Sequence, residues 1–277
     1  MKRQAAVAGH FYKGSRDELQ HQVRGVVQDS QEKVKVFGMV SPHAGLIYSG
    51  RVAGAAYSRI QWPSHIILIG PNHTGLGERF ALMSSGKWEI PTHTFDIDEA
   101  MADMLLKHSV FIKDDPIAHY YEHSLEVQLP FVAHFLSAAA SADLKIVPIT
   151  MLHASLQECN QVGITIARVI QMAIAEGIAT SVVIVASSDM SHYVTEEQAR
   201  YKDNLAIEKI LAMDPEGLYE VVQDAHISMC GVMPVTIMLY ACMELGASKA
   251  ELVKYETSAE TSGDYNHVVG YAGMLIK

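Results

Sequence analysis

The chain has 277 residues, of which 49% are hydrophobic and 19% charged, a composition typical of a folded globular protein. Its formal net charge of −10, with no cluster of Lys and Arg, argues against a nucleic acid as partner because phosphate backbones bind basic surfaces. An odd number of widely spaced cysteines, three in all, argues against a disulfide scaffold. The lack of a signal-like run or a clean apolar span argues against secretion and a membrane, so we expect a cytoplasmic location.

Helix and strand signals alternate along the chain. A capping box of Ser15 and Glu18 predicts a first helix that runs to about residue 30. Apolar periodicity then predicts, in chain order, a strand at 34–40, a helix at 50–60, a strand at 65–69, helices at 98–108 and 122–137, a strand at 144–149, a helix at 155–176, a strand at 181–186, helices at 195–213 and 231–245, and strands at 251–255 and 268–276.

Strands that alternate with helices predict an α/β fold, in which a largely parallel or mixed central sheet is covered by helices on both faces. No internal repeat, low-complexity tract or long linker marks a boundary, so we expect one domain over residues 1–277. Such folds gather functional side chains at the carboxyl ends of their strands. The loops that follow the predicted strands are therefore the places to look for a site.

Two histidines follow predicted strands. His43 lies in the motif SPHAG at residues 41–45, and His73 lies in GPNH at residues 70–73. Each motif has a proline that cannot continue the strand ladder, and the small residues of the first one permit close approach of a ligand. A single loop histidine is more often a surface residue, but the repeated design favours a shared site. Imidazole binds transition metals and exchanges protons near neutral pH, so one metal ion can contact both side chains.

A third segment, SSDMSH at residues 187–192, follows the apolar strand predicted at 181–186. Asp189 and His192 are three residues apart, so in a turn the carboxylate can orient the imidazole and raise its basicity. Asp189 as the N-cap of the next helix is the alternative interpretation. The serines also permit a Ser-His-Asp hydrolase, but the Gly-x-Ser-x-Gly turn of such enzymes is missing. We expect His192 to transfer protons.

The segment EHSLEVQLP at residues 122–130 is predicted to open a helix, since the helix dipole favours acidic residues in the first turn. Pro130 should kink or interrupt that helix. Glu122 and Glu126 are four residues apart and would share one face. Two interpretations stay open: a solvated helix end, or a substrate site in which His123 donates a proton or a hydrogen bond and Glu122 contacts the substrate.

Cys230 lies in SMCG at residues 228–231, just before a predicted helix. The positive end of the helix dipole would lower the pKa of this thiol and favour a thiolate, a good ligand for iron, copper or zinc. Cys159 and Cys242 lie inside predicted helices and are expected to be buried small hydrophobes. Surface or satisfied polar positions are expected for the remaining histidines, including His10, His21, His65, His93, His108, His119, His134, His153, His226 and His267.

These motifs together resemble the MEMO family across nearly the whole chain. The matching segments, in order, are AVAGHFY at 6–12, SPHAG at 41–45, GPNH at 70–73, EHSLEVQLP at 122–130, SSDMSH at 187–192, CG at 230–231 and GDYNHVVGYA at 263–272. The resemblance implies an α/β fold related to the class III extradiol ring-cleaving dioxygenases. It also implies metal ligands at His43, His73 and Cys230, with His192 at the position of the acid/base histidine.

The chain departs from these patterns at two positions. Lys13 stands where the family usually has proline, which concerns the N-terminal segment alone. In true extradiol dioxygenases the third ligand is a carboxylate, whereas the resemblance places Cys230 there. A thiolate is softer, more easily oxidised and better suited to copper, so ring cleavage does not carry over. We expect iron as Fe2+ first, with copper or zinc as alternatives.

Two hypotheses follow for the function. The first is a metal-dependent oxidoreductase in which His192, oriented by Asp189, moves protons while His123 steadies a small-molecule substrate. The second is a non-enzymatic module that uses the same cleft to hold a metal or a peptide. Hydrolysis through metal-bound water comes third. Neither a nucleic acid nor a membrane is expected as partner.

Overall fold

The structure is a computed structural model that describes residues 1–28, 31–138 and 144–277. Its helices are α1 Arg16–Arg24, α2 Leu46–Tyr57, α3 Glu99–His108, α4 Leu129–Ala138, α5 Leu156–Ala175, α6 Glu196–Leu211, α7 Pro215–Asp224, α8 Val232–Glu244 and α9 Ala259–Ser262, with 3-10 turns η1 Pro116–His119 and η2 Glu126–Gln128. Its strands are β1 Lys2–Arg3, β2 Gly38–Ser41, β3 His65–Pro71, β4 Phe80–Leu82, β5 Lys87–Ile90, β6 His93–Asp96, β7 Lys113–Asp114, β8 Lys145–Met151, β9 Val182–Ser187, β10 His192–Val194, β11 Ala250–Thr257 and β12 Val268–Ile276.

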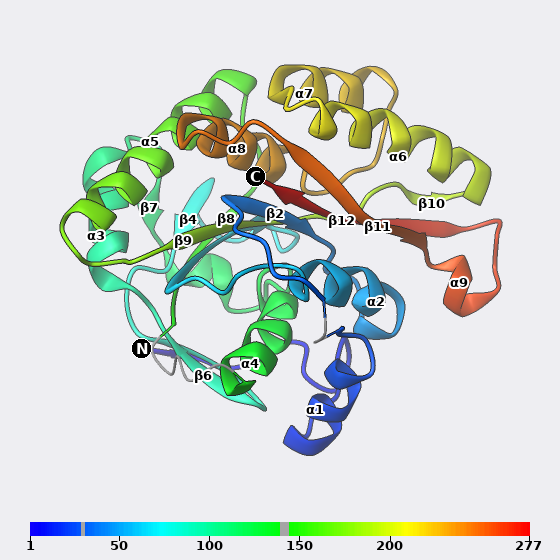
Figure 1. The fold of residues 1–277 in the computed structure, drawn as a ribbon, viewed down its shortest axis with the longest axis horizontal. Coiled ribbons are helices and arrows are strands. Elements are labelled where there is room, and N and C mark those ends of the chain that lie inside the picture. The colour runs from blue at the N-terminus through cyan, green and yellow to red at the C-terminus, as the bar shows by residue number, and fades with distance from the viewer. Residues whose placement is uncertain (29–30, 139–143) are drawn as a thin grey trace.

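One mixed sheet runs through the molecule (Figure 1). Its strand order over the described residues is β10-β12-β2-β9-β3-β8-β4-β7, with β11 paired to β12. The central strands β2, β9, β3 and β8 are parallel, while β12 and β4 flank them in antiparallel orientation. A small separate sheet has the order β1-β5-β6. The predicted α/β class with a mixed central sheet is confirmed.

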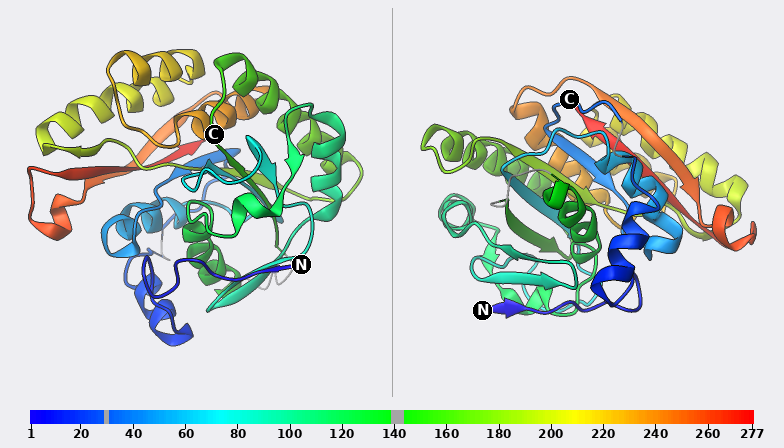
Figure 2. Two further views of the ribbon diagram at one scale, coloured as in Figure 1. Left: turned by 180° about the vertical axis from the view of Figure 1, so that it is seen from behind. Right: turned by 60° about the horizontal axis from the view of Figure 1, so that its bottom comes forward.

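Helices cover both faces of this sheet (Figures 1 and 2). Helices α3, α5, α6, α7 and α8 contribute to the core on one face, and α1, α2 and α4 to the core on the other. Because side chains alternate along a strand, Ile67 and Ile69 of β3 join the first core, while Ile66 and Leu68 join the second. All of β3 is buried, which explains its continuous apolar sequence.

Most predicted elements are present with small shifts at their ends. Strands β3, β8, β9, β11 and β12 and helices α3, α5, α6 and α8 begin and end within two residues of the predicted ranges. The sequence patterns did not indicate α7, β1, β10 or the strands between β3 and α3, several of which are very short. In the described ranges, no helix combines the length and the apolar character needed to cross a membrane.

The first predicted helix and the first predicted strand have wrong boundaries. Helix α1 ends at Arg24 instead of near residue 30, because the chain turns at Gly25 and packs on α2. At Gly54 of α2 a Cβ atom would lie 2.3 Å from the carbonyl oxygen of Val26, so this approach requires glycine. Residues 29–30 lie outside the described residues. Strand β2 begins only at Gly38, and α2 begins before the predicted residue 50.

The helix predicted at 122–137 is also wrong at its start. Residues 120–125 form neither helix nor strand, η2 follows, and α4 begins at Leu129. The Glu122 carboxylate accepts the backbone N–H groups of His123 and Ser124 and holds this segment in a loop. Pro130 falls in the first turn of α4, where its missing N–H costs nothing, so it does not interrupt the helix.

Candidate metal centre

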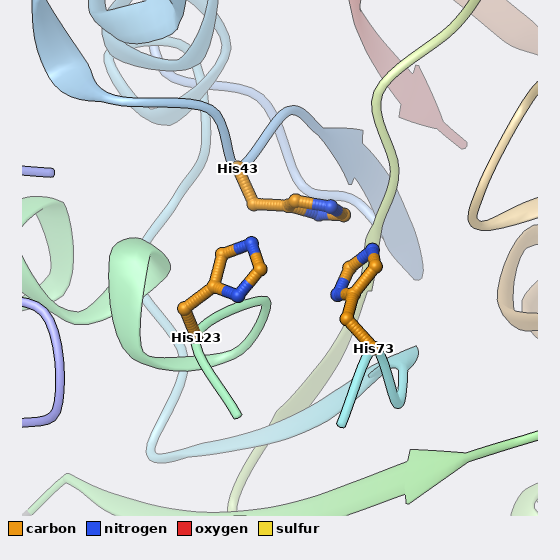
Figure 3. Close-up of side chains that lie close together, drawn as sticks. All are labelled: His43, His73 and His123. Atoms are coloured by element: carbon orange, nitrogen blue, oxygen red, sulfur yellow. The ribbon is translucent and has the colours of Figure 1, made fainter. Parts of the chain in front are cut away.

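Three loops bring three histidines together at one edge of the sheet (Figure 3). His43 follows β2, His73 follows β3, and these strands lie on either side of β9 and are parallel to it, so their carboxyl ends meet at one edge. His123 comes from the loop before η2. One ring nitrogen of each side chain lies within 4.8 Å of the other two. The structure therefore places His43 and His73 next to each other.

Buried hydrogen bonds fix the orientation of His43, which is 2% exposed. Its Nδ1 lies 2.8 Å from Ser187 Oγ, and that hydroxyl donates to the carbonyl oxygen of Ser124 at 2.7 Å. Because the hydroxyl proton is used, Nδ1–H donates to Ser187 and Nε2 keeps its lone pair. Burial and the nearby His73 and His123 lower the pKa of His43 well below its usual value. The neutral imidazole is the form that binds metals.

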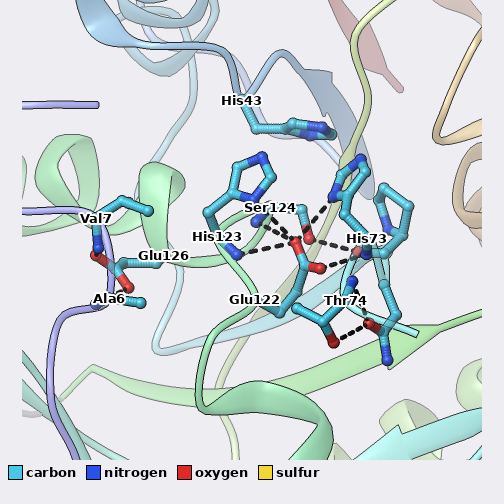
Figure 4. A network of polar contacts seen from close by, with 12 residues as sticks. Ala6, Val7, His43, His73, Thr74, Glu122, His123, Ser124 and Glu126 are labelled. Carbon is cyan, nitrogen blue, oxygen red and sulfur yellow. Dashed lines mark hydrogen bonds and ion pairs between the residues drawn. The ribbon is translucent and has the colours of Figure 1, made fainter. Parts of the chain in front are cut away.

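Glu122 organises the other side of the cluster (Figure 4). Its Oε1 lies 3.0 Å from His73 Nδ1 and accepts the backbone N–H groups of His123 and Ser124, while its Oε2 accepts the backbone N–H of His73. Burial acts to raise the pKa of Glu122, but these bonds and the neighbouring imidazoles lower it to about 2. The ionised carboxylate is 1% exposed, so it is not part of a solvated helix end. Because Glu122 binds His73 through Nδ1, the lone pair of His73 Nε2 remains available to a metal ion.

His123 is supported by ring contacts instead. Its ring centroid lies 4.7 Å from those of His73 and Phe11. Its Nδ1 is 3.5 Å from Glu122 Oε1, at the outer limit of a hydrogen bond. Burial lowers the pKa of His123 although the Glu122 charge opposes this. His123 is expected from the sequence to contact a substrate, and the structure places it in the histidine cluster itself. The signal for this in the sequence is its position next to Glu122.

Cys230 contacts His43. Its Sγ is 3.4 Å from His43 Nε2, close to the separation of about 3.6 Å between nitrogen and sulfur ligands of one tetrahedral ion. It is not a member of the group within 4.8 Å. The expected lowering of the thiol pKa is wrong, because burial and the Asp189 carboxylate raise the pKa of Cys230. Desolvation of the thiolate outweighs the helix dipole here, so a thiolate needs a metal cation that displaces the proton.

Asp189 and His192 do not form the expected hydrogen bond. Asp189 Oδ1 accepts the backbone N–H groups of His43 at 2.8 Å and Ala44 at 3.3 Å, and the N-cap of α6 is Thr195. Burial raises the pKa of Asp189.

The partner of His192 is Ser228. The backbone N–H of His192 donates to Ser228 Oγ at 2.7 Å, and its Nδ1 lies 2.8 Å from the Ser228 carbonyl oxygen. A carbonyl accepts only, so Nδ1 carries the proton and Nε2 has the lone pair. The sequence did not indicate that Ser228 binds His192, although Ser228 lies in the same motif as Cys230.

The cysteines and histidines outside the centre occupy buried as well as surface positions. Cys159 and Cys242 are completely buried, as predicted. His119 is also completely buried, with Nε2 3.1 Å from the carbonyl oxygen of Ala81. His65 is 5% exposed, and its Nε2 lies 2.7 Å from Asp98 Oδ2. Neither of these two histidines is a member of the cluster found among the described residues.

Fold and site together define an α/β protein with a histidine cluster at the carboxyl edge of a mixed sheet, in which His43 is buried and His73 is exposed. The family model for Memo-like protein matches residues 3–275. A MEMO1 family protein of Methanococcus maripaludis is 40% identical, with 100% of both chains covered. Those of Methanopyrus kandleri and Aquifex aeolicus are 37% and 38% identical, covering 100% and 99% of this chain and 99% and 98% of theirs. The chain belongs to the MEMO family.

A solved structure supports the fold independently. The uncharacterized protein JW3007 of Escherichia coli K12 superimposes with a TM-score of 0.50 over 78% of this chain and 87% of that chain. The two sequences are 11% identical, so this likeness concerns the fold alone.

Proposed function

We propose that this protein is a metal-dependent oxidoreductase with a small-molecule substrate, and that His43, His73 and Cys230 hold its metal ion. One observation carries the proposal: Ser187 and Glu122 each bind the Nδ1 atom of one histidine, so the Nε2 atom of each keeps its lone pair for a metal ion. Metal-binding histidines characteristically give one nitrogen to the metal and the other to such an acceptor. The thiol at 3.4 Å from His43 Nε2 supplies a third ligand.

His123 is the competing third ligand. Its nitrogens lie close enough to those of His43 and His73, but no comparably short bond to an acceptor holds its Nδ1. We therefore propose that His123 lies beside the metal ion and contacts the substrate. Co2+ distinguishes the two cases, because a thiolate ligand adds near-ultraviolet charge-transfer absorption that imidazole does not.

The carboxylates near the site have other partners. Both oxygens of Glu122 accept hydrogen bonds, and Asp189 accepts two backbone N–H groups. Glu122 is therefore a poor candidate for the carboxylate ligand of an extradiol dioxygenase, and we propose that ring cleavage is not the reaction. Fe2+ is the first candidate metal, and copper is favoured next by the soft thiol. Such an ion would supply redox chemistry.

We assign proton transfer to His192. Its Nε2 is free to accept a proton, because Nδ1 donates to the carbonyl oxygen of Ser228. In a His192→Ala variant we expect unchanged metal content and loss of whatever turnover the protein has. Loss of the metal together with activity would make His192 a ligand instead.

The test of metal binding compares single variants after anaerobic purification and loading with Fe2+, Cu+ or Co2+. Sharply weaker binding is expected for His43→Ala, His73→Ala and Cys230→Ala, since a three-ligand site rarely survives on two. His123→Ala should keep the charge-transfer absorption of Co2+, and His267→Ala, at a side chain that is 72% exposed, is the control. Unchanged metal content in the first three variants would refute the site.

A non-enzymatic metal- or peptide-binding module is the second candidate, favoured by the thiol that stands where a ring-cleaving enzyme has a carboxylate. If this candidate is right, the protein should bind Fe2+ stoichiometrically, and the loaded protein should consume no oxygen with catechols or small thiols. Oxygen consumption without yellow ring-opened product supports the oxidoreductase. Rapid ring opening by the unmodified protein would overturn our assignment of Cys230, whereas ring opening gained by Cys230→Glu would support it.

A further inference from the structure

The loop that carries Glu122 and His123 has no regular structure of its own. Residues 120–125 lie between η1 and η2 and belong to neither a helix nor a strand. Yet the Glu122 carboxylate must be placed accurately, because it binds both the ring and the backbone of His73. The constraint on this loop therefore comes from elsewhere in the chain.

Arg3 supplies that constraint from a position 119 residues earlier in the chain than Glu122. Its Nε donates to the carbonyl oxygen of His119 at 2.8 Å, and its Nη2 donates to that of Glu122 at 2.6 Å. Its Nη1 pairs with Glu126 Oε2 at 2.6 Å. The guanidinium also lies 4.3 Å from the centroid of the Trp88 ring. The planar guanidinium thus binds the chain at three places: at His119 before the loop, at Glu122 within it and at Glu126 after it.

Glu126 extends this connection to the N-terminal segment. Its two oxygens accept the backbone N–H groups of Ala6 and Val7 and the hydroxyl of Tyr12. The same segment presents Phe11 to the His123 ring, and the Phe11 carbonyl oxygen accepts the backbone N–H of Leu46 next to the His43 loop. The N-terminal segment therefore contacts two of the three loops that carry histidines of the cluster, those of His43 and His123.

The burial of the pair argues for a positioning role. Arg3 and Glu126 side chains are 1% and 0% exposed. A buried ion pair is often no more stable than apolar residues of the same volume, so stability alone does not explain it. The guanidinium, in contrast, offers donors in a rigid planar fork that a lysine or an apolar side chain cannot reproduce.

We propose that Arg3 is a positioning residue of the metal centre, which fixes the Glu122–His123 loop and through Glu122 the orientation of His73. This inference rests on the proposed metal site, but its first consequence does not require metal. Without Arg3, the amide groups of His73, His123 and Ser124 that bind Glu122 lose their protection. Its second consequence is a weaker and geometrically altered metal site.

The decisive variant is the double substitution Arg3→Met with Glu126→Leu, which removes both charges and leaves neither one buried alone. Hydrogen exchange of the three amides is measured by NMR on the full metal-free chain, and Co2+ binding is measured by visible absorption. We expect at least tenfold faster exchange of these amides, roughly tenfold to hundredfold weaker Co2+ binding, and a changed visible spectrum. Arg3→Lys, which keeps the charge but not the fork, should recover only part of both readouts.

Leu105→Ala in α3 is the matched control, because it lowers global stability through a buried side chain remote from the site. It should leave Co2+ binding and its spectrum unchanged. Wild-type exchange rates and Co2+ spectrum in the double variant would overturn the role of Arg3. Failure of the unmodified protein to bind Co2+ would overturn the proposed metal site, while amide exchange still decides whether Arg3 orders the loop. If the double variant does not fold, the same readouts on Arg3→Lys decide.

Discussion

Two serines at paired positions of neighbouring strands have opposite environments. Ser41 of β2 lies beside Ser187 of β9 in the register of the sheet. Ser187 Oγ accepts His43 Nδ1–H and donates to a carbonyl oxygen, whereas the buried Ser41 Oγ has no hydrogen-bond partner in the described part of the chain. At the scale of the residue, the role of each serine therefore depends on its hydrogen-bond partners and not on its residue type.

This contrast gives the first prediction. Ser187→Ala removes the acceptor that fixes the tautomer of His43, so we expect metal affinity to fall roughly tenfold to hundredfold. Ser41→Ala, the matched control, removes an unsatisfied hydroxyl and should leave affinity unchanged and stability equal or slightly higher. Isothermal titration with Zn2+ measures both. Equal affinities in the two variants would contradict the assigned role of Ser187.

His119 gives a prediction about pH. Burial and the neighbouring charge of Arg3 lower the pKa of His119 to about 4, so it stays neutral in the folded protein at pH values where the unfolded chain binds a proton. Stability is therefore complete above the unfolded pKa of about 6.5 and falls as the pH drops toward 4, by at most about 3 kcal/mol from this residue. His119→Gln should flatten this slope in urea unfolding between pH 7 and pH 4.5. Parallel pH curves for the two proteins would exclude the effect.

At the scale of the element, α3 shows how a helix start is joined to the sheet. Asp98 is its N-cap, with Oδ1 accepting the backbone N–H of Met101 at 2.9 Å. The second oxygen lies 2.7 Å from Nε2 of the buried His65 at the start of β3. One carboxylate therefore both begins the helix and links it to a central strand.

The second role makes this cap more important than an ordinary one. Asp98→Ala should lower the free energy of unfolding by about 2 kcal/mol or more, because the cap is lost and His65 Nε2 remains buried without its partner. Asp98→Asn keeps a capping acceptor and should cost less. Thr195→Ala, at the cap of α6, is the control for loss of a cap alone, at about 1 kcal/mol. Chemical denaturation measures all three, and equal losses for the two alanine variants would contradict the link to His65.

At the scale of the whole molecule, one sheet is shared by two cores. The two apolar clusters lie on its opposite faces and are separated by the thickness of the sheet, since consecutive residues of the central strands belong to different clusters. Neither cluster can lose its packing without exposing one face of the same strands.

The shared sheet predicts a single cooperative unfolding transition and supports our proposal of one domain over residues 1–277. Trp62 and Trp88 both report on the core formed with α1, α2 and α4, whereas far-ultraviolet circular dichroism is dominated by all helices together. We expect the two signals to change at the same urea concentration. Two separated midpoints would indicate independently folding halves.

The amino-acid sequence by itself determined the α/β class, most of the helices and strands, and the motifs that indicate the family. Helix and strand periodicity depends on residues a few positions apart, and these patterns are local. The same patterns placed His43 and His73 after strands whose parallel ends meet. They failed at 122–130, where acidic spacing imitates a helix start although Glu122 binds the ring and backbone of His73.

Only the tertiary structure decided how the centre is assembled. His43 meets Cys230 across 187 residues of sequence, and Arg3 meets Glu126 across 123. No local pattern encodes such pairs, because their energy depends on burial and on partners that the folded chain brings together. The raised pKa of Cys230 illustrates this: the helix dipole is readable from sequence, but the desolvation that outweighs it exists only once the chain has packed around the thiol.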